Sequence, residues 1–264
     1  GLVAAGCSIL CYRNQMINVP QKDIEFSMAV LCYHEEESVI PFVENLHSIL
    51  SFFHFNWEIV LVANYWPDIP DRTPDVARSL CERLPHTRYI AEPKQGAMGW
   101  DMKSGLDACE GRYIGVIDGD GQYPIEAILS CFAAIKISDY DFIKTYRVLR
   151  SDSLYRNIVS GIYNRLFKLL FPAYRGFQDV NSKPKIMKRE AYGRMNLHAI
   201  DWFIDAEIVL NCLNLGLQMY EIPIKFQSIE TRKSFVRINA VLEFTRNLFA
   251  YRFGWPPFEN KRKL

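Results

Sequence analysis

Two aspartates, Asp118 and Asp120, stand two residues apart directly after the apolar run 113–117. Glycines on either side of Asp120 allow the tight backbone path that would aim both carboxylates at one divalent cation. Gln122 could add a carbonyl ligand, and hard oxygen ligands of this kind suit Mg²⁺ or Mn²⁺. Asp and Gly are also common turn formers, so an ordinary acidic turn is the alternative. The motif predicts a metal site only in combination with its context.

That context is an alternation of apolar runs and helical patterns. Runs rich in strand formers are followed by helical segments, which is typical of βαβ units and a parallel sheet. In such sheets the ligand lies beyond the carboxyl ends of the strands, where Asp118 and Asp120 stand. The sequence therefore predicts an α/β fold with a mostly parallel central sheet. The expected strands are 26–33, 57–63, 87–91, 113–117 and 141–146, and the expected helices are 37–53, 74–83, 98–109 and 125–137.

Composition and charge are those of an ordinary globular protein. The chain has 264 residues, 49% hydrophobic and 23% charged, and its net charge of +1 gives no general attraction to nucleic acid. Basic residues gather in 144–156, 183–194 and 261–263, where local anion sites can form. Seven cysteines without Cys-x-x-Cys spacing favour a reducing, cytoplasmic setting. The sequence contains no apolar run of about 18 residues, so it predicts no membrane-spanning helix.

The segment 111–124 (GRYIGVIDGDGQYP) resembles the strand and Asp-x-Asp region of the inverting glycosyltransferase family 2. The closest resemblance is to its polyprenyl-phosphate branch, typified by dolichol-phosphate mannose synthases. The likeness extends over residues 26–253. Further matching motifs are Tyr33-His34-Glu35-Glu36-Glu37, Pro93-Lys94-Gln95-Gly96, Gly176-Phe177-Gln178-Asp179, Asp205-Ala206-Glu207 and Glu221-Ile222-Pro223-Ile224.

The resemblance implies a GT-A fold, with helices on both faces of the sheet, and a metal-dependent transfer of one sugar from a GDP- or UDP-sugar. The implied catalytic residues include Arg232, as an electrostatic clamp on the leaving diphosphate, together with Asp118, Asp120 and Asp205. The implied metal ligands are Asp118, Asp120 and Gln122. The residues predicted to bind the nucleotide sugar are Tyr33, Glu35, Asn64, Lys94, Gly96 and Asp118.

One departure from the family concerns the nucleoside. The family usually carries paired aspartates at the end of the second strand, where this chain has Ala63 and Asn64, followed by Tyr65. The Asn64 amide can still bond a base or ribose, because it both donates and accepts, and Tyr65 can stack on the base. The departure leaves the base of the donor open. It also keeps a non-catalytic sugar-nucleotide-binding protein as an alternative.

The acceptor phosphate is predicted to bind Arg147, Arg156 and Ser160, which belong to the basic stretch that begins at Lys144. Arg156 and Ser160 are four residues apart, so they share one helix face. A guanidinium beside a hydroxyl suits a phosphate, and the resemblance implies the phosphate of a polyprenyl acceptor, dolichyl or undecaprenyl. The alternative is a solvated basic face.

A hydroxyl acceptor is the second hypothesis for the reaction. A phosphate monoester is largely ionised near neutral pH and needs no base, whereas a hydroxyl needs a carboxylate base near the anomeric carbon. Candidates by position are Asp179, Asp201 and Asp205, and the sequence does not separate them.

The chain is expected to have three segments. These are an N-terminal extension 1–25, a GT-A domain 26–228, and a C-terminal amphipathic helix with a basic tail, 229–264. Two apolar helix faces, 162–171 and 238–249, lie near basic residues. Faces of this kind usually pack on a core, but together they predict a peripheral attachment to the cytoplasmic face of a membrane.

Overall fold

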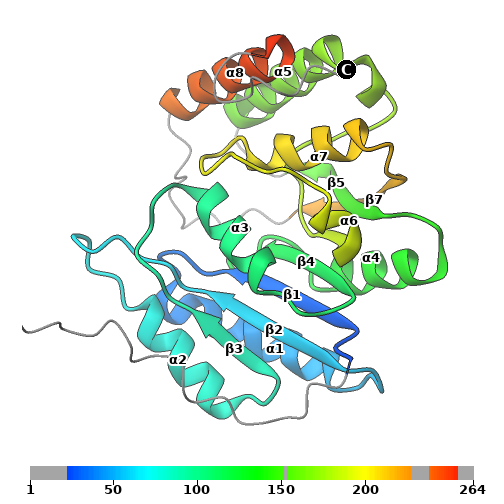
Figure 1. Cartoon of the computed structure of the whole chain (residues 1–264). Coiled ribbons are helices and arrows are strands. Elements are labelled where there is room, and N and C mark those ends of the chain that lie inside the picture. Colours follow the sequence, from blue (N-terminus) through cyan, green and yellow to red (C-terminus); the bar gives the residue numbers. More distant parts are fainter. Residues whose placement is uncertain (1–22, 151–153, 227–237, 255–264) are drawn as a thin grey trace, which may run out of the picture.

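The computed structural model describes residues 23–150, 154–226 and 238–254. Within them, one sheet has the strand order β3-β2-β1-β4-β6-β5-β7 (Figure 1). Every neighbouring pair is parallel except those of β6, which runs antiparallel to β4 and β5. The predicted mostly parallel sheet is confirmed. The strands are β1 (Phe26–Leu31), β2 (Trp57–Val62), β3 (Thr87–Ile90), β4 (Tyr113–Asp118), β5 (Phe142–Arg150), β6 (Lys185–Lys188) and β7 (Met219–Phe226).

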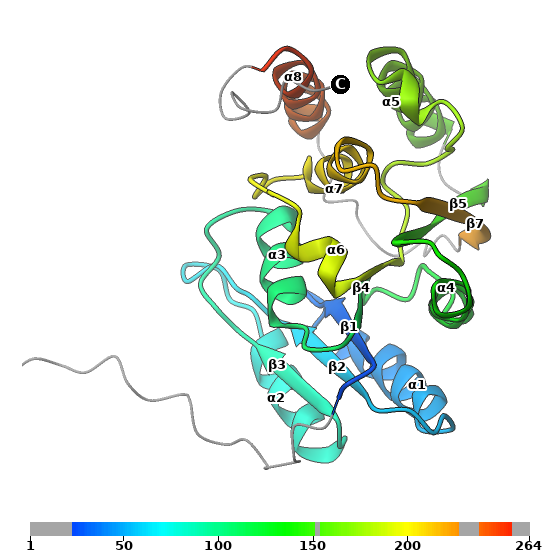
Figure 2. The same cartoon turned by 45° about the vertical axis from the view of Figure 1, so that its right-hand side comes forward.

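Helices cover both faces of the sheet, as predicted (Figures 1 and 2). One face carries α1 (Ile40–Leu50), α2 (Thr73–Arg83) and α4 (Glu126–Ile137). The other face carries α3 (Met98–Ala108), α6 (Arg189–Gly193) and α7 (Ile204–Asn214), with α5 (Leu154–Leu170) and α8 (Ile238–Phe253) on the outer side of α7. Two short 3-10 helices, Glu36–Val39 and Pro172–Tyr174, complete the described elements.

The central strands are apolar along their whole length because both of their faces are buried. In β1 every residue is buried, and successive side chains enter opposite cores. Met28 and Val30 pack with α1 and α4, whereas Ala29 and Leu31 pack with α3 and α7. This explains why the strand reads as a continuous apolar run rather than as an alternation.

Several predicted boundaries shift for local reasons. The helix expected from residue 37 begins at Ile40, since Pro41 suits the first turn and a 3-10 turn precedes it. The strand expected at 141–146 extends to Arg150. Strand β6 was not predicted, because two of its four residues are lysines. The predicted division at 25 and 228 stays a prediction, although α8 packs Leu248 and Tyr251 into the same core as α7.

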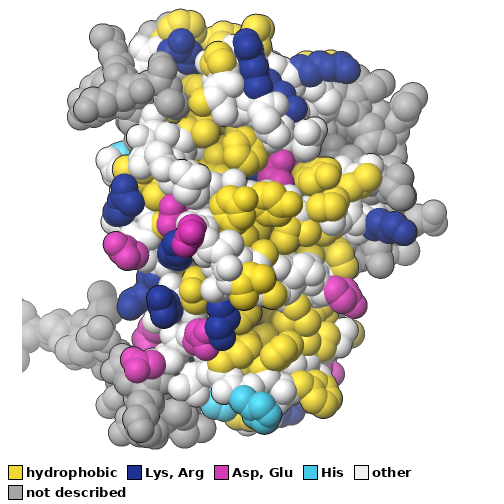
Figure 3. Space-filling model, turned by 90° about the vertical axis from the view of Figure 1, so that its right-hand side faces the viewer, with side chains coloured by type: hydrophobic (Ala, Val, Ile, Leu, Met, Phe, Trp, Pro, Cys, Tyr) yellow, Lys and Arg dark blue, Asp and Glu magenta, His cyan; other side chains and the backbone are white. Residues whose placement is uncertain are grey.

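The amino edge of the sheet carries exposed apolar side chains. Phe52 follows α1, Ile137 ends α4 and Tyr220 lies near the start of β7, and all three are exposed. Figure 3 shows hydrophobic side chains gathered across this side of the molecule. Among the described helices, none combines the length and the apolar character needed to cross a bilayer.

Candidate active site

The motifs singled out in the sequence gather at the carboxyl edge of the sheet. Leu31 at the end of β1 pairs in register with Asp118 at the end of β4. Beyond β2 and β3, Tyr65 and Pro93 form an isolated parallel bridge. The chain segments that follow β1, β2, β3 and β4 therefore start beside one another, where a parallel sheet binds its ligand.

The Asp-x-Asp turn is held by backbone and side-chain hydrogen bonds. The Gly119 amide donates to the Leu31 carbonyl at 2.8 Å, and the Gln122 amide donates to Asp120 Oδ1 at 3.0 Å. Gly121 has φ +72°, a left-handed conformation that glycine adopts without strain. The Asp118 side chain is 28% exposed. The turn therefore presents two partly exposed carboxylates from one short loop.

This donor set fits a divalent cation that is completed by its substrate. Within the described residues, no group of three or more His, Cys, Asp and Glu side chains could hold a metal by itself. Asp118, Asp120 and Gln122 offer two carboxylates and an amide oxygen, all partly exposed. Hard cations bound by one or two carboxylates take their remaining ligands from water and substrate phosphates. The site therefore suits a Mg²⁺ or Mn²⁺ ion whose coordination is completed by water and, in the complex, by a phosphorylated ligand.

The predicted donor loop contributes a buried lysine. Lys94 forms an ion pair with Asp101 of α3, and its ammonium lies 4.2 Å from the centre of the Tyr33 ring. Burial lowers the pKa of Lys94, although the Asp101 carboxylate opposes that shift. Glu35, also predicted to contact the donor, is buried and accepts a hydrogen bond from Ser38 Oγ at 2.9 Å. The loop after β1, with Tyr33 and Glu35, thus lies beside the loop of Lys94, and the predicted contacts of these residues with the donor stay predictions.

Asn64 has a different environment from the one its donor role requires. Its side chain is fully buried, and its amide donates to Asp101 Oδ1 at 3.1 Å and to Ser104 Oγ at 2.8 Å. Its Oδ1 accepts the Glu92 amide at 3.0 Å. In this structure Asn64 therefore positions Asp101 and the donor loop. Its predicted contact with a nucleoside stays a prediction, and it would require these bonds to be exchanged.

Gly96 of the donor loop and Gly99 of α3 allow this part of the chain to approach a second loop closely. A Cβ on Gly96 would lie 2.5 Å from the Ile200 carbonyl oxygen, and one on Gly99 would lie 2.5 Å from that of Asp201. The second loop is in turn fixed by the fully buried Glu207, whose Oε2 accepts the Ala199 amide at 2.7 Å. The Glu207 motif therefore acts on the donor side by shaping the backbone against which Gly96 and Gly99 pack.

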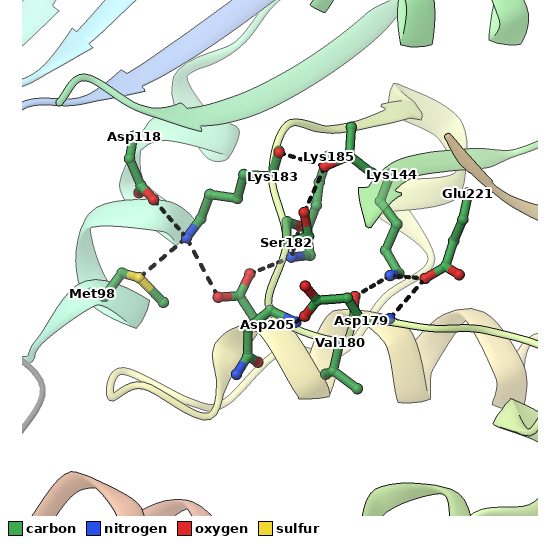
Figure 4. Close-up of polar contacts among 12 residues, drawn as sticks. Met98, Asp118, Lys144, Asp179, Val180, Ser182, Lys183, Lys185, Asp205 and Glu221 are labelled. Atoms are coloured by element: carbon green, nitrogen blue, oxygen red, sulfur yellow. Dashed lines mark hydrogen bonds and ion pairs between the residues drawn. The ribbon is translucent and has the colours of Figure 1, made fainter. Parts of the chain in front are cut away.

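A layer of paired charges lies beneath the Asp-x-Asp turn (Figure 4). Lys185 donates to Asp205 Oδ1 at 2.5 Å and to the Ser182 carbonyl at 2.7 Å. Lys183 Nζ lies 3.3 Å from Asp118 Oδ2 and 3.5 Å from Asp205 Oδ2. Asp205 is 2% exposed. Its carboxylate faces the two ammoniums, and its predicted catalytic role stays a prediction.

The two ammoniums differ in how burial and neighbouring charge act on them. Burial alone disfavours both charged forms. For Lys185 burial prevails and lowers the pKa to about 8. For Lys183 the carboxylates of Asp118 and Asp205 outweigh burial and raise the pKa. Lys183 therefore carries its charge at neutral pH.

The bunched lysines at 144 and 183–185, where local anion sites were expected, are buried rather than solvated. Lys144, Lys183 and Lys185 are all buried, and each forms an ion pair with a carboxylate of this chain. Bunched lysines suggest a solvated basic face because their spacing along the sequence does not show which carboxylates they pair with in the fold. The available signal was the alternation of Lys183 and Lys185 with apolar residues up to Met187, which is the pattern of a strand.

The predicted acceptor side lies around β5 and α5. Arg147 makes two hydrogen bonds to Asp179, at 2.6 and 3.0 Å. Ser160 is half-buried on α5, and Arg156 belongs to the same helix one turn earlier. The side chain of Arg156 and all of Arg232 lie outside the described residues. Arg147 thus lies on β5, Arg156 and Ser160 lie on α5, and their predicted contact with an acceptor phosphate stays a prediction.

Comparisons with known proteins agree with this architecture. A dodecaprenyl-phosphate galacturonate synthase of Rhizobium johnstonii is 30% identical over 151 residues, which are 56% of this chain and 44% of that protein. A dolichol-phosphate mannosyltransferase of Pyrococcus furiosus is 23% identical over 231 residues, 86% of this chain and 63% of that protein. The chain thus spans less than two thirds of the length of both relatives.

A solved structure supports the fold. Glucosyl-3-phosphoglycerate synthase of Mycobacterium tuberculosis, in complex with Mn²⁺, UDP and glucosyl-3-phosphoglycerate, superposes with a TM-score of 0.69 over 88% of this chain and 81% of that one. The identity of 14% makes this a likeness of fold alone. The profile of Glycosyl transferase family 2 matches residues 27–195, which are more than half of the sequence and include the Asp-x-Asp turn. The chain therefore belongs to glycosyltransferase family 2.

Proposed function

We propose that this chain transfers a single sugar, with inversion, from a UDP- or GDP-sugar to a polyprenyl phosphate at a membrane surface. The donor would bind at the carboxyl edge of the sheet, with Tyr33 and Lys94 on the nucleotide side and Asp118 and Asp120 at the diphosphate. A divalent cation held by Asp118, Asp120 and Gln122 would neutralise charge on the leaving diphosphate. The relatives whose names refer to dodecaprenyl and dolichol phosphates support the acceptor.

The observation that carries the choice of acceptor is the state of the three candidate bases. Asp205 bonds to Lys185, and Asp179 is bound by both arms of the Arg147 guanidinium. Asp201 accepts the Phe203 amide at 2.8 Å and the Asn247 amide at 2.6 Å.

Each of these carboxylates thus already accepts hydrogen bonds from this chain, and would have to exchange one of them in order to take a proton from a hydroxyl. A phosphate monoester, with a second pKa of about 6, needs no such base. This favours a phosphate over a hydroxyl as the attacking group.

The experiment that tests the function compares two acceptors that differ only in the phosphate. The protein is incubated with radiolabelled UDP- and GDP-sugars and Mn²⁺, together with a polyprenyl phosphate or the matching polyprenol. We expect label to enter the organic phase only with the phosphate. Label on the polyprenol would favour the hydroxyl-acceptor hypothesis. Absence of transfer together with tight nucleotide-sugar binding would favour a non-catalytic binding protein.

The Arg156→Ala variant is expected to lose acceptor use and keep donor binding. Arg156 precedes Ser160 by one turn of α5, and removing a charge-assisted hydrogen bond costs about 1.5–3 kcal/mol. The KM for polyprenyl phosphate should therefore rise by roughly 10- to 100-fold, while calorimetry finds an unchanged Kd for the nucleotide sugar. Arg175→Ala, at an exposed position beyond the same helix, is the matched control. Equal losses for donor and acceptor would remove the phosphate site.

The attachment to a membrane is proposed for one face of α5. The predicted apolar face 162–171 divides in the structure, because Tyr163, Phe167 and Phe171 are buried in the core. Ile162 and Leu169 remain exposed, at 58% and 69%. They are seven residues apart and so lie on one side of the helix. Most of the predicted face is therefore core, and a narrow strip remains for the membrane. The side chains 238–242 of the second predicted face lie outside the described residues.

Vesicle flotation tests this strip. The double variant Ile162→Ser/Leu169→Ser should bind vesicles containing anionic lipid at least about tenfold more weakly, because two apolar side chains no longer enter the interface. Rising salt should weaken the wild-type binding without removing it. Ile137→Ser, which alters an exposed apolar residue at the amino edge, is the control. If Ile137→Ser reduces binding and the α5 variant does not, the membrane lies against the amino edge instead.

A further inference from the structure

Lys183 lies between the Asp-x-Asp turn and the interior of the molecule. It precedes β6, its side chain is 3% exposed, and its ammonium contacts carboxylates from two other elements. Asp118 comes from the end of β4, and Asp205 from α7. Figure 4 shows the ammonium between these two side chains, with the Met98 sulfur, 3.4 Å away, on its third side.

Contacts with three side chains restrict the position of the Lys183 ammonium. Besides Asp118, its Nζ lies 3.5 Å from Asp205 Oδ2 and 3.4 Å from the sulfur of Met98 in α3. Lys185 bonds to the other oxygen of Asp205, whereas Lys183 also contacts Asp118. Of these two lysines, Lys183 is the one that touches a residue of the Asp-x-Asp turn. It therefore acts on Asp118 as a fixed charge.

A divalent cation bound to Asp118 would share that carboxylate with the ammonium. The divalent cation and the ammonium, both positive and both next to one carboxylate, repel each other strongly in a partly buried site, where screening by water is weak. Lys183 also supplies positive charge next to the place where a diphosphate would bind. The same side chain should thus oppose the metal and favour the anionic nucleotide.

We propose that Lys183 is a built-in cation of the donor site, which weakens divalent-metal binding at the Asp-x-Asp turn and sustains binding of the nucleoside diphosphate when no metal is present. This inference rests on the proposed donor site. It concerns the balance between metal and protein charge there rather than the reaction itself. Lys183 acts on the metal through Asp118 and on the nucleotide through its own charge.

The test uses three substitutions of one residue. Lys183→Gln removes the charge and keeps a hydrogen-bond donor, Lys183→Met removes both, and Lys183→Arg keeps the charge. The variants should fold, because Asp205 retains Lys185 and Asp118 is open to water. Thermal unfolding checks this. Calorimetry then measures Mn²⁺ binding with and without UDP, and UDP binding in EDTA. Lys188→Gln, at the end of β6, partly exposed and paired with Asp141, is the control.

Removal of the charge should move the two affinities in opposite directions. We expect Lys183→Gln and Lys183→Met to bind Mn²⁺ on the order of tenfold more tightly, and UDP in EDTA on the order of tenfold more weakly, than the wild type. Lys183→Arg and Lys188→Gln should resemble the wild type. Unchanged Mn²⁺ affinity, or a loss of both affinities, overturns the proposal and makes Lys183 an ordinary buried counter-ion.

The outcome is separable from a failure of the proposed function. If neither UDP nor GDP binds the wild type under any condition, the proposed donor class is wrong. The Mn²⁺ titration without nucleotide still measures the effect of Lys183 on the turn, and equal Mn²⁺ affinities there would overturn the inference.

Discussion

The Asp120→Ala variant is expected to lose metal-dependent binding of a nucleoside diphosphate. Asp120 is one of two carboxylates in the turn after β4, and the other, Asp118, is shared with Lys183. Loss of even an outer partner of a metal ligand costs 10- to 100-fold, so loss of the ligand itself should cost at least about a hundredfold. Calorimetry with UDP and Mn²⁺, repeated in EDTA, measures the metal-dependent part directly.

A second substitution separates charge from backbone geometry. Asp120 Oδ1 accepts the Gln122 amide, so alanine also removes a bond that holds the turn. Asp120→Asn keeps an oxygen for that bond but carries no charge. Both variants should lose the Mn²⁺-dependent gain, and Asp139→Ala, at an exposed position after α4, should keep it. Wild-type affinity in Asp120→Asn would rule out Asp120 as a metal ligand.

The features that the sequence predicted well are those determined by local pattern. The apolar runs of β1, β2 and β4 are continuous because both faces are buried, and each ends at a polar motif. Parallel strands place their carboxyl ends at one edge, so Asp118 and Tyr33 could be expected near one another without any structure. The placement of the donor-side motifs follows from topology alone.

Pairing between distant charges could not be predicted in the same way. Asp205 was predicted as a catalytic carboxylate, whereas in the fold it meets Lys183 and Lys185, which are about twenty residues away along the chain. The partners of Asn64 are equally non-local, since Asp101 and Ser104 lie on α3. Spacing identifies which residues can ionise or bond, but the fold decides with which partner.

The apolar face of α5 shows the same limit for packing. Helical periodicity predicts that residues 162–171 share a wide apolar surface. It does not show how much of that surface a neighbouring helix covers. In the structure Phe167 is fully buried and contacts Tyr174 and Phe171, while Leu169 is exposed. The membrane strip is consequently narrower than the pattern indicates.

The Lys144→Met variant is expected to be the most destabilising single change in the acceptor region. Lys144 on β5 is 1% exposed and forms an ion pair with Glu221 of β7, and it also donates to the Asp179 carbonyl. Glu221 in turn accepts the Gln178 amide at 2.6 Å. Breaking a buried pair by removing one partner costs about 3–5 kcal/mol, because the remaining charge stays buried without compensation.

Urea unfolding followed by circular dichroism measures this loss. Lys188→Met, which breaks a half-exposed pair with Asp141, should cost only about 0–1 kcal/mol and is the matched control. The double variant Lys144→Met/Glu221→Leu should regain most of the lost stability, since no unpaired charge remains. Its loop 176–182 would still lack the Glu221 acceptor for the Gln178 amide, so acceptor use should stay low although the protein is stable again. A double variant as unstable as Lys144→Met would show that packing around Lys144, rather than its charge, supports this region.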